Sequence, residues 1–213
     1  MNPQQKEEPL YPLLSLVRHR IGTDGDGVTT LVAGAGCPLH CRWCINMEIL
    51  KRAPAARITA GALLEKVMVD DLYFRATGGG ITFGGGEPLL HASFIAAFRD
   101  LCPSDWRIRV ETSLAVPPEN VITAASAVDE FIVDCKDLDE DRYRNYTGGD
   151  VSRMLDNLTW LLEAVGQERI LVRVPQIPGY NTEDDQRENA RILQEMGFTR
   201  LDLFPYIIRH NNV

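Results

Sequence analysis

Three of the five cysteines in this 213-residue chain fall within eight positions. Cys37, Cys41 and Cys44 have the spacing C-x3-C-x2-C in the stretch "GCPLHCRWCIN". Thiolates are soft ligands for zinc, copper(I) and iron–sulfur clusters, so this spacing indicates a metal centre. Three thiolates leave one iron of a four-iron cluster without a protein ligand, and an open metal position is typical of a catalytic site.

A structural zinc ion and a set of inert buried cysteines are the alternatives for this loop. Structural zinc prefers four closed ligands, usually as two close pairs far apart in sequence. Cys102 and Cys135 lie in a predicted helix end and a predicted strand, so they make no second pair with the three clustered cysteines. His40 directly precedes Cys41, and adjacent residues rarely bind one tetrahedral ion without strain. Free cysteines are often buried, but three of them in one polar loop make this alternative weak.

Two further motifs follow predicted strands. "GGGITFGGGEPLL" (residues 78–90) brings Gly85, Gly86 and Glu87 directly after a strand, where glycines allow a ligand to approach the backbone closely. A plain glycine turn before a helix would explain this motif if it stood alone. The next strand ends in "VETS", which places Glu111 and Thr112 toward the same edge of the sheet.

Charged residues also interrupt the last predicted strands. Asp134 and Lys136 share one face of their strand, because side chains alternate along a strand, although a solvated strand edge would give the same pattern. Arg173 lies within an apolar run, where an unpaired charge is costly. Its partner is either a ligand carboxylate or one of Asp134 and Glu111.

The elements that position these residues alternate between strands and helices. Strands are predicted at Val28–Ala33, Gly80–Phe83, Arg107–Thr112, Glu130–Lys136, Ile170–Gln176 and Leu201–Pro205. Helices are predicted at 59–77 with Thr59 as N-cap, and at His91–Leu101, Pro118–Ala127, Val151–Val165 and Thr182–Met196. This alternation predicts an α/β fold of six parallel strand–helix units, either a partial barrel or an open curved sheet. Ligands of such folds collect at the carboxyl ends of the strands.

Composition narrows the class of protein further. The formal net charge of −8 argues against a nucleic-acid-binding surface, which normally needs a basic face. No run of 18 apolar residues is present, so we expect no membrane span. The N-terminus does not have the pattern of a signal peptide, and an odd number of cysteines argues against a disulfide framework, so we expect a cytoplasmic protein. We predict one domain over residues 1–213, with residues 1–20 as an N-terminal arm whose apolar part, Leu10–Val17, packs on the body.

The cysteine spacing, with an aromatic residue (Trp43) before the last cysteine, resembles the signature of the radical S-adenosylmethionine enzymes. This resemblance implies a partial (β/α)6 barrel of parallel strands and a [4Fe–4S] cluster on the loop 37–44. Its open iron would bind S-adenosylmethionine, whose reductive cleavage gives a 5′-deoxyadenosyl radical. The protein would supply orientation and water exclusion.

From about Ser15 to Tyr206 the chain resembles the glycyl-radical-enzyme activases, the family of the pyruvate formate-lyase activating enzymes. The motifs are "DGDG" (24–27), "CPLHCRWCIN", "TGGGITFGGGEPLL", "VDCKDLDEDRYRNYTG", "RVPQIPGYN" and "LFPY". The resemblance implies a glycyl-radical enzyme as protein substrate, flavodoxin or ferredoxin as electron donor, and "IPGYN" (177–181) as the loop on the adenine side. The implied cofactor contacts are Trp43, Gly85, Gly86, Glu87, Glu111, Thr112, Asp134, Lys136 and Arg173.

The chain departs from the family pattern at several positions. Asp26 stands in place of the proline of "DGPG", and "TSL" (112–114) stands in place of "TNG". Ile207 follows "PY" where the activases carry a histidine, with His210 three residues later, and the sequence ends soon after its last predicted strand without the family's closing helix. These departures leave open a second hypothesis, in which the same radical chemistry modifies a peptide or a small molecule directly.

Overall fold

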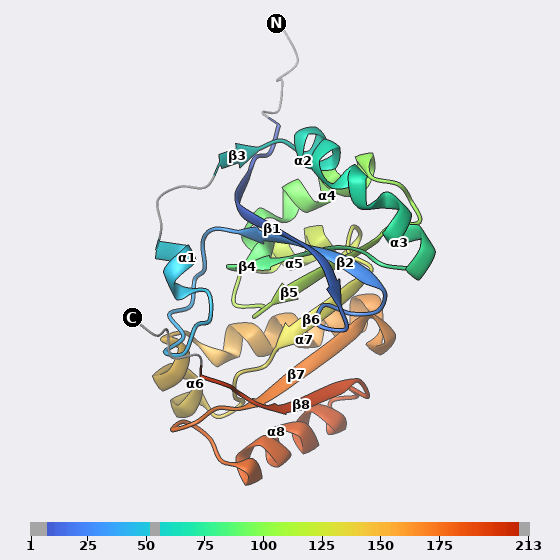
Figure 1. The fold of residues 1–213 in the computed structure, drawn as a ribbon. Helices are drawn as coiled ribbons and strands as arrows, with labels where there is room; N and C mark the ends of the chain where they lie inside the picture. Colours follow the sequence, from blue (N-terminus) through green and yellow to red (C-terminus); the bar gives the residue numbers. More distant parts are fainter. Residues whose placement is uncertain (1–7, 52–55, 209–213) are drawn as a thin grey trace, which may run out of the picture.

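The computed structural model describes residues 8–51 and 56–208, which form one eight-stranded sheet with helices on its outer face (Figure 1). The sheet order is β3-β1-β2-β4-β5-β6-β7-β8. The strands are β1 Tyr11–Ile21, β2 Val28–Gly34, β3 Ala56–Ile58, β4 Gly80–Gly85, β5 Arg107–Thr112, β6 Glu130–Asp134, β7 Ile170–Gln176 and β8 Leu201–Pro205. The six predicted strands are β2 and β4 to β8, and all of them pair in parallel, which confirms the predicted α/β partial barrel.

The helices follow the strands in the predicted alternation. They are α1 Met47–Lys51, α2 Ala60–Val67, α3 Asp71–Thr77, α4 Ala92–Leu101, α5 Pro118–Ala125, α6 Glu140–Thr147, α7 Val151–Val165 and α8 Glu183–Glu195, with short 3-10 turns at Met68–Asp70, Pro88–His91 and Gln167–Arg169. The helix predicted over 59–77 is broken by the first of these turns. The break turns Asp70 inward, where it is almost fully buried and accepts a hydrogen bond of 2.9 Å from the Thr30 hydroxyl of β2. No helix in the described part of the chain has the length and apolar character to cross a membrane.

The segment 1–20, predicted to be an arm, is instead part of the sheet where it is described. Residues Tyr11–Ile21 form β1, which pairs antiparallel with β2 and, through Tyr11–Leu13, with β3. A hairpin signal was present in the sequence, because the glycine-rich turn 22–27 separates two strand-like runs. The antiparallel β1 and β3 extend the parallel sheet at one end.

The strand register separates an apolar outer face from a polar inner face. Phe83 of β4 pairs with Val110 of β5 on the outer face, where Tyr11, Phe94 and Phe98 pack against Phe83. On the inner face, the register places charged side chains side by side: Asp134 of β6, Arg173 of β7 and Asp202 of β8 occupy one row. The inside of the partial barrel is therefore a polar site, whereas the core lies between the sheet and the helices.

Candidate active site

A cavity of about 500 Å³ lies inside the barrel, toward the carboxyl ends of the parallel strands. This is the size of an ordinary small-molecule site. Its lining includes every predicted site residue except Trp43: Cys37, Cys41, Cys44, Gly85, Gly86, Glu87, Glu111, Thr112, Asp134, Lys136 and Arg173. The fold therefore brings together motifs that lie up to about 140 residues apart in the sequence.

The loop 37–44, which we call the cluster loop, follows β2 and is held by main-chain hydrogen bonds to the end of α6. His40 N donates to Thr147 O at 2.7 Å, and Arg42 N donates to Tyr146 O at 3.1 Å. The sequence reasoning missed α6, although its signals were present. Asp139 caps its N-terminus by accepting a hydrogen bond from the amide of Arg142, and Gly148 ends it in the left-handed conformation.

The thiols of Cys37, Cys41 and Cys44 line one shared cavity, so they can serve as ligands of one common group. Three thiolates can hold a four-iron cluster and leave one iron without a protein ligand. Burial raises the pKa of Cys37 to about 11 and also raises the pKa of Cys41, so metal binding there would have to release their protons.

The turn after β4 brings its glycine backbone against the chain that follows β2. Gly86 N donates to Gly34 O at 2.9 Å, and Glu87 N donates to Gly36 O at 2.8 Å. A Cβ at Gly86 would lie 2.1 Å from Gly36 O, so only glycine fits there. This close approach positions the cluster loop and the β4 turn on the same side of the cavity.

The Glu87 carboxylate, which lines the cavity, holds the end of β5. It accepts hydrogen bonds from the hydroxyls of Thr112 and Ser113, both at 2.7 Å, and from the amides of Ser113 at 2.8 Å and Leu89 at 3.1 Å. Burial raises the pKa of Glu87, and these donors act against that rise. Glu87 and Thr112 both line the cavity, and their contact with the cofactor stays a prediction.

The charged residues of β5 to β8 pair across the inner face. Arg173 Nη1 lies 2.9 Å from Glu111 Oε1, and its other amino group donates to the carbonyl of Thr23. Lys136 Nζ lies 2.9 Å from Asp134 Oδ2. Burial raises the pKa of Glu111, and Arg173 opposes this rise. Of the two partners considered for Arg173, the structure shows pairing within the protein, at the wall of the cavity.

Several residues that line the cavity were not predicted as site residues. Arg20 and Thr23 come from the β1–β2 hairpin, and Phe204 and Tyr206 come from the end of the chain. Asn46 follows the last cysteine directly, and its side-chain amide donates to Gly85 O at 2.7 Å. This bond joins the cluster loop to the β4 turn, so the position of Asn46 within "CIN" was the available signal.

Trp43 is not among the residues that line the main cavity, and its contact with the cofactor stays a prediction. Its indole N–H donates to Pro178 O at 3.3 Å, and the hydroxyl of Tyr206 donates to its carbonyl. In this structure Trp43 therefore attaches the cluster loop to the loop 177–181.

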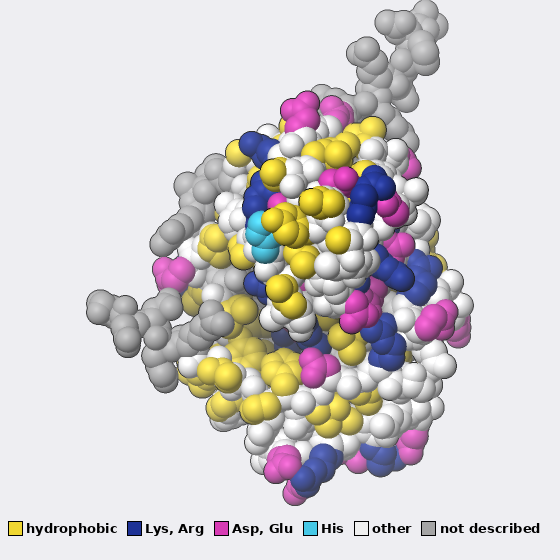
Figure 2. Space-filling view, turned by 45° about the vertical axis from the view of Figure 1, so that its right-hand side comes forward, with side chains coloured by type: hydrophobic (Ala, Val, Ile, Leu, Met, Phe, Trp, Pro, Cys, Tyr) yellow, Lys and Arg dark blue, Asp and Glu magenta, His cyan; other side chains and the backbone are white. Residues whose placement is uncertain are grey.

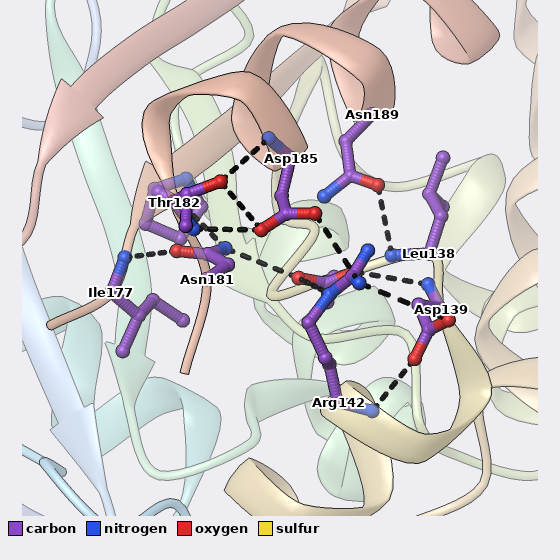
Figure 3. A network of polar contacts seen from close by, with 10 residues as sticks. Leu138, Asp139, Arg142, Ile177, Asn181, Thr182, Asp185 and Asn189 are labelled. Carbon is purple, nitrogen blue, oxygen red and sulfur yellow. Dashed lines mark hydrogen bonds and ion pairs between the residues drawn. The ribbon is translucent and has the colours of Figure 1, made fainter. Parts of the chain in front are cut away.

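The loop 177–181 is fixed by a polar network beside α6 and α8 (Figure 3). Asn181 accepts a hydrogen bond from Ile177 N and donates to Asp137 Oδ2 at 3.1 Å. The buried Asp137 carboxylate also accepts a hydrogen bond of 3.1 Å from Arg142 of α6. The network thereby connects the loop on the predicted adenine side to the helix that holds the cluster loop.

Two departures from the family pattern, Leu114 and Ile207, lie in different surroundings. Leu114, which stands where the family has glycine, has φ 54° and is fully buried. This left-handed conformation is strained for a leucine, and it is braced because Asn157 donates to Leu114 O at 2.8 Å and to Val116 O at 2.9 Å. Ile207 is 77% exposed and does not line the cavity. His210 lies outside the described residues.

Comparisons with known proteins show the family of this chain. The sequence profile of the radical SAM superfamily matches residues 31–188, so the chain belongs to the radical SAM superfamily. It is 28% identical to the pyruvate formate-lyase 2-activating enzyme of Escherichia coli (strain K12), over 95% of this chain and 80% of that protein. It is 30% identical to the choline trimethylamine-lyase activating enzyme of Oleidesulfovibrio alaskensis, over 86% of this chain and 79% of that protein. It is also 30% identical to the pyruvate formate-lyase-activating enzyme of Clostridium pasteurianum, over 86% of this chain and 77% of that protein. The chain is a radical SAM enzyme of the activating-enzyme kind.

Solved structures show the same fold at low sequence identity. SuiB of Streptococcus suis matches with a TM-score of 0.65 and 14% identity over 85% of this chain. The chain spans only 40% of the length of SuiB, so the likeness concerns the barrel alone. TYW1 matches with a TM-score of 0.57 and 15% identity over 87% of this chain and 66% of its own.

Proposed function

We propose that this chain holds a [4Fe–4S] cluster at Cys37, Cys41 and Cys44 and, with S-adenosylmethionine, removes a hydrogen atom from a glycine Cα of a glycyl-radical enzyme. The observation that carries the proposal is that the three thiols and the polar ends of five parallel strands line one cavity. The named activating enzymes that the chain resembles support the choice of protein substrate.

The cofactors supply one-electron cleavage of a sulfonium bond and hence a hydrogen-abstracting radical, and the chain supplies their placement. The Gly85–Gly86 backbone admits close approach of the amino acid part of S-adenosylmethionine. Arg20, Lys136 and Arg173 are cations on the cavity wall, and each already faces a carboxylate. A ligand carboxylate can share the Arg173 guanidinium with Glu111, since a guanidinium offers five donors.

The electron donor is proposed to be flavodoxin or ferredoxin. Cys44 lines the main cavity and also a smaller hollow of about 270 Å³ on the outer side of the cluster loop. A cluster bound there lies close to the surface, which supports one-electron delivery from a small redox protein. The five free cysteines support a reducing, cytoplasmic setting. The negative net charge supports a partner other than nucleic acid.

Replacing Arg173 by alanine is expected to raise the Kd for S-adenosylmethionine by roughly tenfold to a hundredfold, since it removes a charge-assisted contact to the ligand carboxylate. Equilibrium binding to the reconstituted protein measures this change. Arg187→Ala is the matched control, because Arg187 is exposed on α8 and pairs only with neighbouring residues of that helix. An unchanged Kd for Arg173→Ala would contradict the assignment.

The proposed function is tested by mixing the reduced, reconstituted enzyme with S-adenosylmethionine and a candidate glycyl-radical enzyme. The expected result is a glycyl doublet in the electron paramagnetic resonance spectrum together with 5′-deoxyadenosine. Cleavage of S-adenosylmethionine without a doublet on any candidate partner, but with a modified peptide or metabolite, would favour the second hypothesis of direct substrate modification.

A further inference from the structure

In the described part of the chain, β8 is the last strand of the sheet, and no strand pairs with its edge opposite β7. In the β7–β8 ladder, Val172 N donates to Arg200 O at 2.9 Å and Tyr206 N donates to Gln176 O at 2.8 Å. The main-chain N–H and C=O groups of successive residues point to opposite sides of a strand. The N–H and C=O groups of the even-numbered residues of β8 therefore point toward β7. The N–H and C=O of Leu201 and Leu203 then point away from the sheet, and among the described residues no hydrogen bond reaches them.

Pro205 supports this direction independently. A proline has no N–H and is found in sheets only where the ladder does not need one. Pro205 is two residues after Leu203, so its main-chain nitrogen points to the same side, away from β7. The N–H that proline lacks would therefore lie on the free edge, and the hydrogen bonds between β7 and β8 remain complete. The free edge of β8 therefore offers the N–H of Leu203 flanked by main-chain carbonyls.

This edge borders the candidate active site. The side chains of Asp202 and Phe204 line the cavity, whereas the intervening Leu203 is 45% exposed. In Figure 2 the surface is hollowed between the half that carries β1, β2 and α3 and the half that carries β7, β8 and α8. A chain lying along β8 would thus pass directly over the opening of the cavity.

The opposite lip, formed by β1, is less suited to receive a strand. Its pairing with β3 ends at Leu13, and its register with β2 shifts between Val17 and Arg20. His19 has φ 54° within this shift, and Arg18 and Arg20 flank it. Irregular backbone and charges of this kind are the usual protection of an edge strand.

We propose that the glycine-bearing segment of the partner protein binds as an added strand on the free edge of β8. This inference rests on the proposed function and specifies how its substrate is held. A glycine has no side chain to recognise, and strand addition recognises main-chain groups. A glycine in an added strand carries a hydrogen in the position where another residue carries Cβ, so this hydrogen can point into the cavity.

Leu203→Pro tests the proposal because it removes one edge N–H and leaves the β7–β8 hydrogen bonds in place. Leu203→Ala is the matched control, since it removes the side chain and keeps the N–H. We expect Leu203→Pro to form the glycyl radical roughly tenfold more slowly than Leu203→Ala, the effect of one lost hydrogen bond. Cleavage of S-adenosylmethionine without the partner should stay the same in both variants. Equal rates of radical formation in the two variants would overturn the proposal.

A second measurement needs no variant of the enzyme. A short peptide copying the partner's glycine segment is N-methylated at one amide at a time, and its binding to the reconstituted enzyme is measured. Strand addition predicts that N-methylation weakens binding only at every second amide of the peptide. Binding that no methylation weakens, or that is weakened without this alternation, would refute the proposal. A wild-type enzyme that cleaves S-adenosylmethionine but forms no glycyl radical refutes the proposed function itself. Normal radical formation by Leu203→Pro refutes only the strand addition.

Discussion

Cys41→Ala is expected to abolish cleavage of S-adenosylmethionine and to lower the iron content of the reconstituted protein. Cys41 lies in the middle of the cluster loop, and its thiol faces the same cavity as those of Cys37 and Cys44. A cluster with two protein thiolates has lost a covalent ligand that no nearby cysteine replaces, and the same result is expected for Cys37→Ala and Cys44→Ala. Iron and sulfide analysis measures the cluster, and chromatography of 5′-deoxyadenosine measures the cleavage.

Cys102→Ala and Cys135→Ala are the matched controls for this prediction. Both cysteines are buried, and neither lines the cavity. Their variants should keep nearly the full iron content and most of the activity, with the modest loss of stability expected when a small buried side chain is shortened. Loss of the cluster in Cys135→Ala would show that the three-ligand assignment is wrong.

Glu87→Ala is expected to lower the free energy of unfolding by about 3 kcal/mol, because four donors around the carboxylate lose their acceptor inside the protein. Those donors belong to Leu89, Thr112 and Ser113, so the ends of β4 and β5 would separate at the wall of the cavity. Urea unfolding measures the change, and binding of S-adenosylmethionine should weaken in parallel.

Glu65→Ala is the control for the loss of a glutamate, since Glu65 is exposed on α2. Glu87→Gln removes the charge and keeps the size of the side chain. The glutamine oxygen can still accept hydrogen bonds, but its NH2 group would face N–H and O–H donors that the carboxylate accepts from. We expect Glu87→Gln to lie between the wild type and Glu87→Ala. A Glu87→Ala protein as stable as Glu65→Ala would contradict the bracing role.

The parallel strands and the cysteine loop were predictable because their signals are local. Apolar, β-branched runs such as Ile170–Gln176 and glycine turns such as the one ending β4 depend on neighbouring residues and on strand geometry. The spacing of Cys37, Cys41 and Cys44 likewise sets which metals one short loop can hold. Two of the elements that were not predicted, β1 and α6, also carried recognisable turn and capping signals.

The partners of the polar side chains were decided only by the tertiary structure. Glu87 meets Thr112, and Arg173 meets Glu111, across 25 and 62 residues of sequence. Trp43 turns from the cavity to Pro178, 135 residues away. Each pairing depends on which strands are neighbours and on their register. Residue types and spacing do not specify these to within the few ångströms that a hydrogen bond requires. The sequence by itself therefore determined the chemistry available to this protein, and the tertiary structure decided which groups line the cavity and which of them bond one another.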